Sequence, residues 1–262
     1  MEYSCELWDG CTIEYANKLD KIQNEAARIV TGLPRYASIE SLYFETGWET
    51  LSDRRRRRKL CLFHKLHNGK APTYLNDCLT PIVGTTNPYN LRNEANYVYP
   101  QTRIETYSRS FFPSVTRIWN SLDIRLRRVP TVENFKLLLR NQNSALKPPS
   151  YYSTGQRKLN VLHTRLRHMS SSLKADLFGV GLVPDQKCTC GWPIEDSIHF
   201  FLECSLYIDQ RRAYIDNLPD TGEDRITMIL FGSQVLDNTG NIDNFRNVQH
   251  FIQHSGRFSF DY

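Results

Sequence analysis

The sequence predicts a mainly α-helical protein with one small β-hairpin or irregular segment. Apolar residues recur at helical spacing through most of the chain, whereas β-forming residues cluster only between residues 97 and 106. The helical patterns are short and follow one another closely, which is typical of compact helix packing. The 262 residues are 40% hydrophobic and 12% aromatic, so the chain has enough apolar side chains to form a folded core.

The first helix is expected between Thr12 and Thr31. Its apolar residues recur on one helix face, Thr12 can cap its N-terminus, and Gly32 is a stop signal after its last turn. Together with three further helices it is expected to form a compact helical region over residues 1–83. Those helices are expected at residues 38–44, 52–68 and 72–79.

Residues 84–140 are expected to form a connecting arm followed by two helices. A loop signal at residues 84–88 precedes the β-forming residues 97–106, which Pro100 interrupts, so this part is interpreted as a hairpin or an irregular arm. Helical spacing then returns in two segments, at residues 111–122 and 131–140.

Residues 141–155 are interpreted as a linker, because they contain Pro148-Pro149 and few large aliphatic side chains. Beyond the linker we expect a small helical domain at residues 156–217 and a C-terminal helical tail at residues 218–262. Helices are expected there at residues 159–168, 171–178, 206–217, 225–231 and 242–254.

Three cysteines and one histidine follow the pattern C-x-C-x8-H-x4-C. The residues are Cys188, Cys190, His199 and Cys204. Three thiolates and an imidazole are the ligands of a closed, four-coordinate structural zinc site, and the sequence therefore predicts a structural zinc ion as cofactor. The alternative is that these are ordinary buried thiols beside a surface histidine.

A run of six basic residues lies on the helix expected at residues 52–68. The run consists of Arg54, Arg55, Arg56, Arg57, Arg58 and Lys59. Successive helix positions point in all directions, so some of these side chains face solvent, where guanidinium groups bind phosphates well. Arg165 and Arg167 add further candidate contacts to nucleic acid. The alternatives are a solvated helix face or a nuclear-localisation patch.

Several signatures of other protein classes are missing from the sequence. No Asp-Asp pair, Walker-type glycine loop or H-E-x-x-H motif occurs, so no catalytic site and no enzyme activity are expected. Residues 1–4 do not resemble a secretory signal, and no run of about 18 apolar residues could span a membrane. With an odd number of cysteines, seven, the chain is expected in the nucleus or the cytoplasm.

Several sequence blocks occur in an order that resembles a known family. The blocks are Trp8–Cys11, Leu19–Gly32, Arg54–Gly69, Tyr89–Asn93, Ser110–Ser114, Ile118–Leu122, Pro130-Thr131, Leu159–Arg167 and the C-x-C-G…H-F-F-L-E-C segment. Over residues 3–215 they resemble the region after the palm in non-LTR (LINE-like, jockey-type) retrotransposon reverse transcriptases.

The resemblance implies a helical, thumb-like region that grips a template–primer duplex. It also implies that Arg54–Lys59 contact phosphates and that the zinc-bearing segment helps to bind RNA or target DNA. The fingers, the palm and the usual endonuclease are missing from this chain, so polymerase activity does not carry over.

We therefore expect a nucleic-acid-binding remnant of such a reverse transcriptase, with RNA, DNA or both as partners. Neither a membrane nor a small-molecule substrate is expected as a partner. There are two main alternatives: a structural or protein-interaction module, and a translated fossil without a selected function. A more distant alternative is an enzyme, namely a cryptic nuclease.

Overall fold

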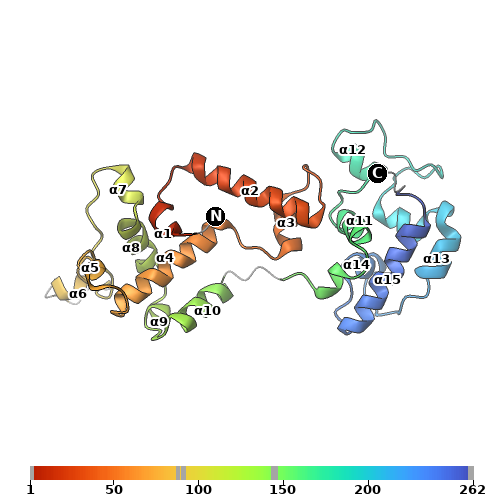
Figure 1. The fold of residues 1–262 in the computed structure, drawn as a ribbon. Helices are drawn as coiled ribbons and strands as arrows, with labels where there is room; N and C mark the ends of the chain where they lie inside the picture. The colour runs from red at the N-terminus through yellow and green to blue at the C-terminus, as the bar shows by residue number, and fades with distance from the viewer. Residues whose placement is uncertain (1–2, 87–88, 90–92, 143–146, 259–262) are drawn as a thin grey trace. The chain divides into compact units, whose positions relative to one another are not determined.

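The computed structural model describes residues 3–86, 89, 93–142 and 147–258 (Figure 1). The protein is mainly α-helical, as expected, and the described residues contain no sheet. Contacts divide the chain into two compact units. Unit 1 comprises Met1–Gln23 and Trp48–Ala145, and unit 2 comprises Asn24–Gly47 and Leu146–Tyr262.

This division differs from the expected domain boundaries. Residues 24–47, which were expected to belong with the N-terminal helical region, are part of unit 2. The expected segments 156–217 and 218–262 form one body, because the long C-terminal helix packs against helices of the preceding segment. Neither association has a local signal in the sequence, since both depend on contacts between distant segments.

The helix α2 (Ile13–Thr31) begins and ends where the sequence predicts and contributes to both units. The other helices of unit 1 are α1 (Cys5–Trp8), α4 (Leu51–His67), α5 (Thr73–Asn76), α6 (Val83–Thr86), α7 (Glu105–Arg109), α8 (Phe111–Asn120), α9 (Ile124–Arg127) and α10 (Val132–Gln142).

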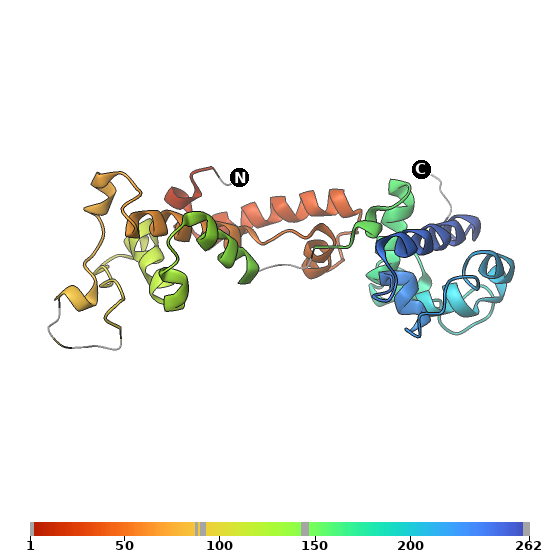
Figure 2. The same ribbon diagram turned by 90° about the horizontal axis from the view of Figure 1, so that it is seen from below.

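The core of unit 1 forms where α4 packs against α8 and α10 (Figures 1 and 2). Phe63 on α4, Trp119 on α8 and Phe135 on α10 are fully buried. The ring centroids of Phe63 and Trp119 lie 5.0 Å apart, and those of Trp119 and Phe135 lie 5.8 Å apart. Thr50 begins α4 by accepting a hydrogen bond of 3.1 Å from the backbone N–H of Asp53, as an N-cap does.

The segment expected as a hairpin or an irregular arm is irregular. Among the described residues, one isolated antiparallel bridge joins Ile82 to Tyr97, and α7 occupies the end of the β-forming stretch. The Tyr97 ring is buried 5.1 Å from Phe63, so this β-forming residue serves the helical core instead of a strand pair. Residues 87–88 and 90–92 of this segment lie outside the described residues.

Unit 2 contains the helix α3 and all elements after residue 146. They are α3 (Ile39–Thr46), η1 (Ser150–Ser153), α11 (Arg157–Arg167), α12 (Lys174–Gly179), η2 (His199–Glu203), η3 (Ser205–Tyr207), α13 (Ile208–Tyr214), α14 (Arg225–Phe231) and α15 (Asn238–His254). The helix α15 packs against α11, α13 and α14, and it contributes the buried Phe251 to the core.

Part of the expected linker at residues 141–155 is packed against unit 2. The short helix η1 contacts α15, and its Tyr152 is buried with its ring stacked at 5.6 Å from the ring of Phe245. Prolines and few aliphatic residues marked this stretch as a linker, but its two tyrosines supply the apolar surface that packs. Residues 143–146 lie outside the described residues.

Candidate metal centre and nucleic-acid interface

The four predicted metal ligands come together in unit 2. The ligand atoms of Cys188, Cys190, His199 and Cys204 all lie within 4.8 Å of one another. The sulfurs of Cys188 and Cys204 are 3.8 Å apart, and Nε2 of His199 is 3.2 Å from the sulfur of Cys190. Zn–S bonds of about 2.3 Å at tetrahedral angles would place two sulfurs about 3.8 Å apart, so the geometry suits a four-coordinate ion.

The first two cysteines lie on a tight turn. The backbone N–H of Cys188 donates to the carbonyl of Trp192 at 2.9 Å, and that of Gly191 donates to the carbonyl of Cys188 at 3.0 Å. Gly191 has a φ of 97°, a conformation that residues with a side chain rarely adopt. The glycine therefore allows the chain to reverse and to present both sulfurs on one side.

His199 and Cys204 are placed by the single wide turn of η2, a π-helix. Asp196 accepts a hydrogen bond of 2.8 Å from the backbone N–H of His199 at the start of this turn. At its end, the backbone N–H of Cys204 donates to the carbonyl of His199 at 2.7 Å. This i→i+5 bond brings the cysteine back beside the histidine. The sequence pattern predicted a helical stretch here but not its π geometry.

Apolar side chains surround the cluster. Cys204, Phe200 and Phe201 are fully buried, and Cys188 is 4% exposed. The ring of Trp192 stacks on His199 with a centroid distance of 5.4 Å and an angle of 6° between the ring planes. All four ligand positions are supplied by the protein, which is typical of a structural centre and leaves no open position for substrate, although Cys190 is only partly buried.

The protonation chemistry of the cluster also suits a cation. A hydrogen bond from the backbone of Trp192 lowers the pKa of Cys190 to about 7, whereas burial raises the pKa of Cys204 to about 12. A bound cation deprotonates coordinating thiols, so the buried Cys204 would bind as a thiolate. Nδ1 of His199 has no hydrogen bond within the described residues, and Oε2 of Glu203 lies 3.7 Å from it. The arrangement assigns Nε2 as the ligand atom and Glu203 as the nearest outer carboxylate.

The basic run on α4 divides into buried and exposed side chains. Arg55 and Lys59 are 4% and 6% exposed, and both form ion pairs with Asp9, the residue that follows α1. Arg57 pairs with Glu49. Arg55 and Lys59 are therefore corrected from predicted phosphate contacts to structural cations that bind α1 to α4. No local signal in the sequence indicates this pairing, because Asp9 lies more than forty positions away.

Apart from Arg56, the other arginines of the basic run border a cavity of about 600 Å³. Arg54, Arg57 and Arg58 line it, joined by Lys65 on α4 and Lys136 on α10, and Glu6 is the one acidic residue among the lining residues. We call this cavity the basic groove. Arg56 and Arg58 are exposed, whereas Arg54 and Arg57 are partly buried. Lys65 and Lys136 were not among the predicted contacts; Lys65 follows the basic run on the same expected helix, whereas Lys136 has no local signal in the sequence.

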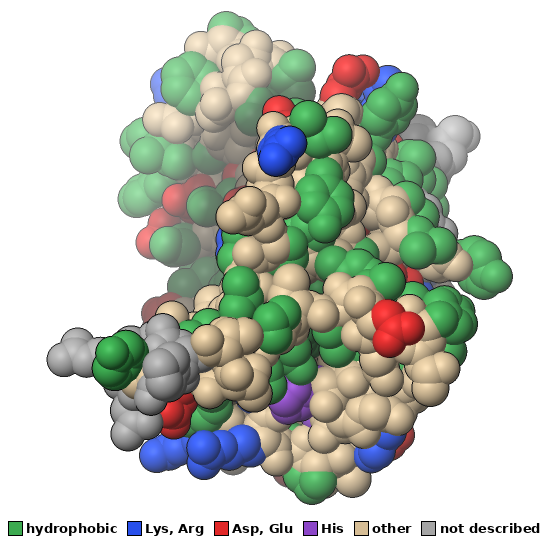
Figure 3. Space-filling view, turned by 90° about the vertical axis from the view of Figure 1, so that its left-hand side faces the viewer, with side chains coloured by type: hydrophobic (Ala, Val, Ile, Leu, Met, Phe, Trp, Pro, Cys, Tyr) green, Lys and Arg blue, Asp and Glu red, His purple; other side chains and the backbone are tan. Residues whose placement is uncertain are grey.

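Lys and Arg side chains are not gathered evenly over the surface. On the face that Figure 3 shows, hydrophobic and uncharged side chains predominate, and the Lys and Arg side chains are scattered between them. The tyrosines also divide between surface and core: Tyr89 and Tyr107 are exposed, whereas Tyr97 and Tyr152 are buried.

The two predicted arginine contacts on α11 have structural partners in unit 2. The side chain of Arg167 is 0% exposed and donates to the carbonyl of Leu230 at 2.7 Å and to the carboxylate of Glu45 at 2.5 Å. Its place in the core corrects the prediction that it contacts nucleic acid. Arg165 is partly buried and donates to the carbonyl of Gly32 at 2.9 Å.

Comparison with models of known protein families, with curated proteins and with solved structures finds no match for this chain. Among the described residues, no helix combines the length and the apolar composition needed to cross a membrane.

Proposed function

We propose that this chain is a zinc-stabilised nucleic-acid-binding protein of the kind found after the palm in non-LTR reverse transcriptases. The basic groove is the observation that carries the proposal. It gathers guanidinium and ammonium groups from two helices around a cavity of about 600 Å³, with one acidic side chain among the lining residues. Phosphates relieve the mutual repulsion of such groups and accept bidentate hydrogen bonds from arginine.

The helix α10 gives the groove its second wall. Lys136 is exposed and lies more than seventy positions from the basic run in the sequence, yet the packing of α10 on α4 brings it to the same cavity. Basic residues on two walls of one groove can contact successive phosphates of a nucleic-acid backbone. A helix face that is merely solvated does not require cations from a second helix beside it.

The metal bound by Cys188, Cys190, His199 and Cys204 is proposed to be zinc in a structural role. The three thiols and the imidazole form a closed donor set at the edge of the core of unit 2. Bound there, zinc would hold the turn at residues 188–192 to the π-helical turn and so stabilise this unit.

The test is fluorescence anisotropy of zinc-replete protein with labelled RNA and DNA across a salt series. We expect affinity to fall steeply with salt, with a slope of about 0.9 per phosphate contact on duplex DNA. A groove variant carrying Arg58→Glu, Lys65→Glu and Lys136→Glu should bind weakly and show a smaller slope.

The matched control carries Lys18→Glu, Lys187→Glu and Arg246→Glu, which changes the net charge equally at exposed positions away from the groove. It should bind nearly as the wild type does. Equal losses of affinity in both variants would show that only the overall charge matters. The proposal would be excluded if folded wild-type protein bound neither RNA nor DNA at low salt.

A second candidate function, a protein-interaction module, is favoured by an apolar cavity of about 680 Å³ in unit 2. Ile198, Val180 and Phe231 line it and are each more than a third exposed. Such exposed apolar surface is typical of protein contacts. A folded, zinc-containing protein without affinity for polyanions would favour this candidate.

A further inference from the structure

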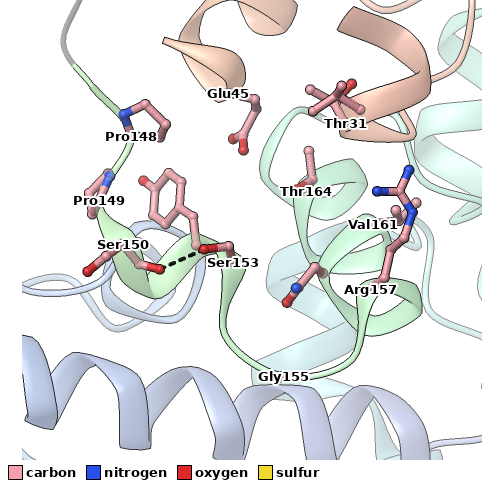
Figure 4. A pocket seen from close by; sticks show the side chains of 13 residues that line it. Thr31, Glu45, Pro148, Pro149, Ser150, Ser153, Gly155, Arg157, Val161 and Thr164 are labelled. Carbon is pink, nitrogen blue, oxygen red and sulfur yellow. Dashed lines mark hydrogen bonds between the residues drawn. The ribbon is translucent and has the colours of Figure 1, made fainter.

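A separate cavity of about 490 Å³ lies within unit 2, between the end of α2, α3, η1 and α11 (Figure 4). Its volume is within the range of about 300–1,000 Å³ that is typical of small-molecule sites. Its lining mixes apolar side chains with polar groups from distant parts of the chain, among them Glu45 and Thr164. We call it the Glu45 cavity.

A buried carboxylate points into this cavity. The Glu45 side chain is 6% exposed, and Figure 4 shows its carboxylate directed towards the space between Pro148 and Thr164. Oε1 accepts hydrogen bonds from Arg167 at 2.5 Å and from His168 at 2.8 Å. Both of these hydrogen bonds go to Oε1, so Oε2 remains available to a ligand.

The carboxylate is ionised at neutral pH. Burial opposes its ionisation, but the hydrogen bonds from His168 and Arg167 and their charges outweigh burial and hold the pKa of Glu45 below its ordinary value. An anionic acceptor favours a ligand that presents N–H groups, because hydrogen bonds to a charged group are stronger than those to a neutral one.

The cavity also offers hydrogen-bond donors. The hydroxyl of Thr164, a residue that is 5% exposed, has no partner within the described residues. The oxygen of the Asn160 side chain accepts from Gln249 at 2.8 Å, which leaves its NH₂ group to donate. A ligand that fits should therefore carry adjacent N–H donors for Glu45 and, beside them, an acceptor.

A positive charge lies at the edge of the same cavity. Arg157 is exposed and is anchored by donating to the carbonyl of Ile29 at 2.5 Å. Figure 4 places its side chain on the side of the cavity that carries Val161. An anionic group attached to the ligand can lie there in water, while the donor edge of the ligand reaches the buried carboxylate.

We propose that the Glu45 cavity binds an unpaired guanine base of a nucleic-acid strand. Guanine presents N1–H and N2–H₂ side by side with the acceptor O6, whereas adenine and cytosine each present a single amino group and uracil a single N–H between two acceptors. The 5′-phosphate of the nucleotide would lie near Arg157. Reading an extruded base by its Watson–Crick edge is a general mode of recognition. This inference rests on the proposed nucleic-acid binding, and it adds base preference to it.

The test is calorimetric titration of the full-length, zinc-replete protein with GMP, IMP and AMP. IMP differs from GMP only by the missing N2 amino group, and we expect it to bind about tenfold more weakly, as for the loss of a hydrogen bond to a charged group. AMP should not bind measurably. Equal affinity for GMP and IMP would overturn the inference.

Two variants locate the binding. Glu45→Gln should abolish the preference for GMP over IMP, whereas Glu40→Gln, at an exposed position of the same helix α3, should leave it unchanged. Glu45 also pairs with Arg167, so changing it can disturb the fold as well as the cavity. A second variant, Val161→Phe, retains the carboxylate but fills the cavity and should block GMP binding. Unchanged GMP binding by a folded Val161→Phe protein would place the site elsewhere.

Binding of labelled poly(U), which contains no guanine, separates the two proposals. A protein that binds poly(U) through the basic groove but ignores GMP refutes the guanine site alone. Failure to bind GMP, poly(U) and labelled DNA refutes both proposals. GMP binding by a protein without affinity for RNA or DNA would keep the cavity as a nucleotide site and exclude the proposed function.

Discussion

The guanidinium carbon of Arg167 lies 3.6 Å from the centroid of the Tyr152 ring, and the arginine side chain is completely buried. The cation is compensated by this ring face, by the carboxylate of Glu45 and by the carbonyl of Leu230. These groups come from α3, η1, α11 and α14, so one side chain joins elements from both chain segments of unit 2.

Replacing Arg167 with methionine should destabilise unit 2 by about 3–5 kcal/mol, because the carboxylate of Glu45 stays buried after its main partner is removed. Urea denaturation followed by circular dichroism measures the change. Arg165→Met is the control: this side chain is only partly buried, with one hydrogen bond to the carbonyl of Gly32, and its loss should cost about 1 kcal/mol. Similar losses for both variants would contradict a special role of the buried arginine.

The buried His163 predicts a loss of stability in mild acid. Burial, supported by the charge of Arg167, lowers its pKa from 6.5 to about 3 in the folded protein. Between these two values the unfolded chain binds more protons, so stability is complete above about pH 6.5 and falls as the pH is lowered towards 3. At pH 5 the loss amounts to about 2 kcal/mol.

The measurement is urea denaturation of the wild type and of His163→Asn at pH 7 and pH 5. The variant should be less stable at pH 7, since the hydrogen bond of 2.9 Å between Nε2 and the carbonyl of Ile229 is altered, but it should lose less stability on acidification. His254→Asn, at an exposed position, should keep the wild-type pH response. A His163→Asn protein with the wild-type response would show that other groups cause the acid sensitivity.

The metal centre predicts one zinc ion per chain. Native mass spectrometry of the wild type should show this stoichiometry, and Cys204→Ser should lose the ion because a hydroxyl does not replace a buried thiolate ligand. Cys78→Ser changes an exposed cysteine outside the cluster and should keep the zinc. Retention of zinc by both variants would rule out this donor set.

The core of unit 1 can be tested separately from zinc binding. Trp119→Ala removes a fully buried indole from between Phe63 and Phe135 and should cost about 3–5 kcal/mol. Because the two units have separate cores, hydrogen exchange should accelerate in α4, α8 and α10 while zinc content and protection of α15 persist. Loss of zinc together with unfolding of unit 1 would show that the two cores unfold as one.

Local signals in the sequence predicted the helices well. Helix α14 has the predicted bounds Arg225–Phe231, and α2 ends at Thr31 before Gly32, as expected from its stop signal. The clustering of the four candidate ligands could also be predicted, since all four lie within seventeen positions and a turn with one glycine brings them together.

Long-range pairings could not be predicted in the same way. Asp9 neutralises two members of the basic run, and Glu45 holds Arg167 in the core, yet neither acid lies near its partner in the sequence. A charge pattern shows which groups need compensation but not which distant residue supplies it. For the same reason the Glu45 cavity, built from α3 and α11, has no signature in the sequence.

The division of the chain into units has a consequence for its synthesis. Unit 2 is discontinuous: Asn24–Gly47 joins Leu146–Tyr262, and most of unit 1 lies between them. On the ribosome, α3 must therefore wait for its packing partners until the whole of residues 48–145 has been made. During this interval Leu42, which is fully buried in the finished protein, has no core to pack against. A fragment that begins at residue 146 would lack α3 and its Leu42 altogether.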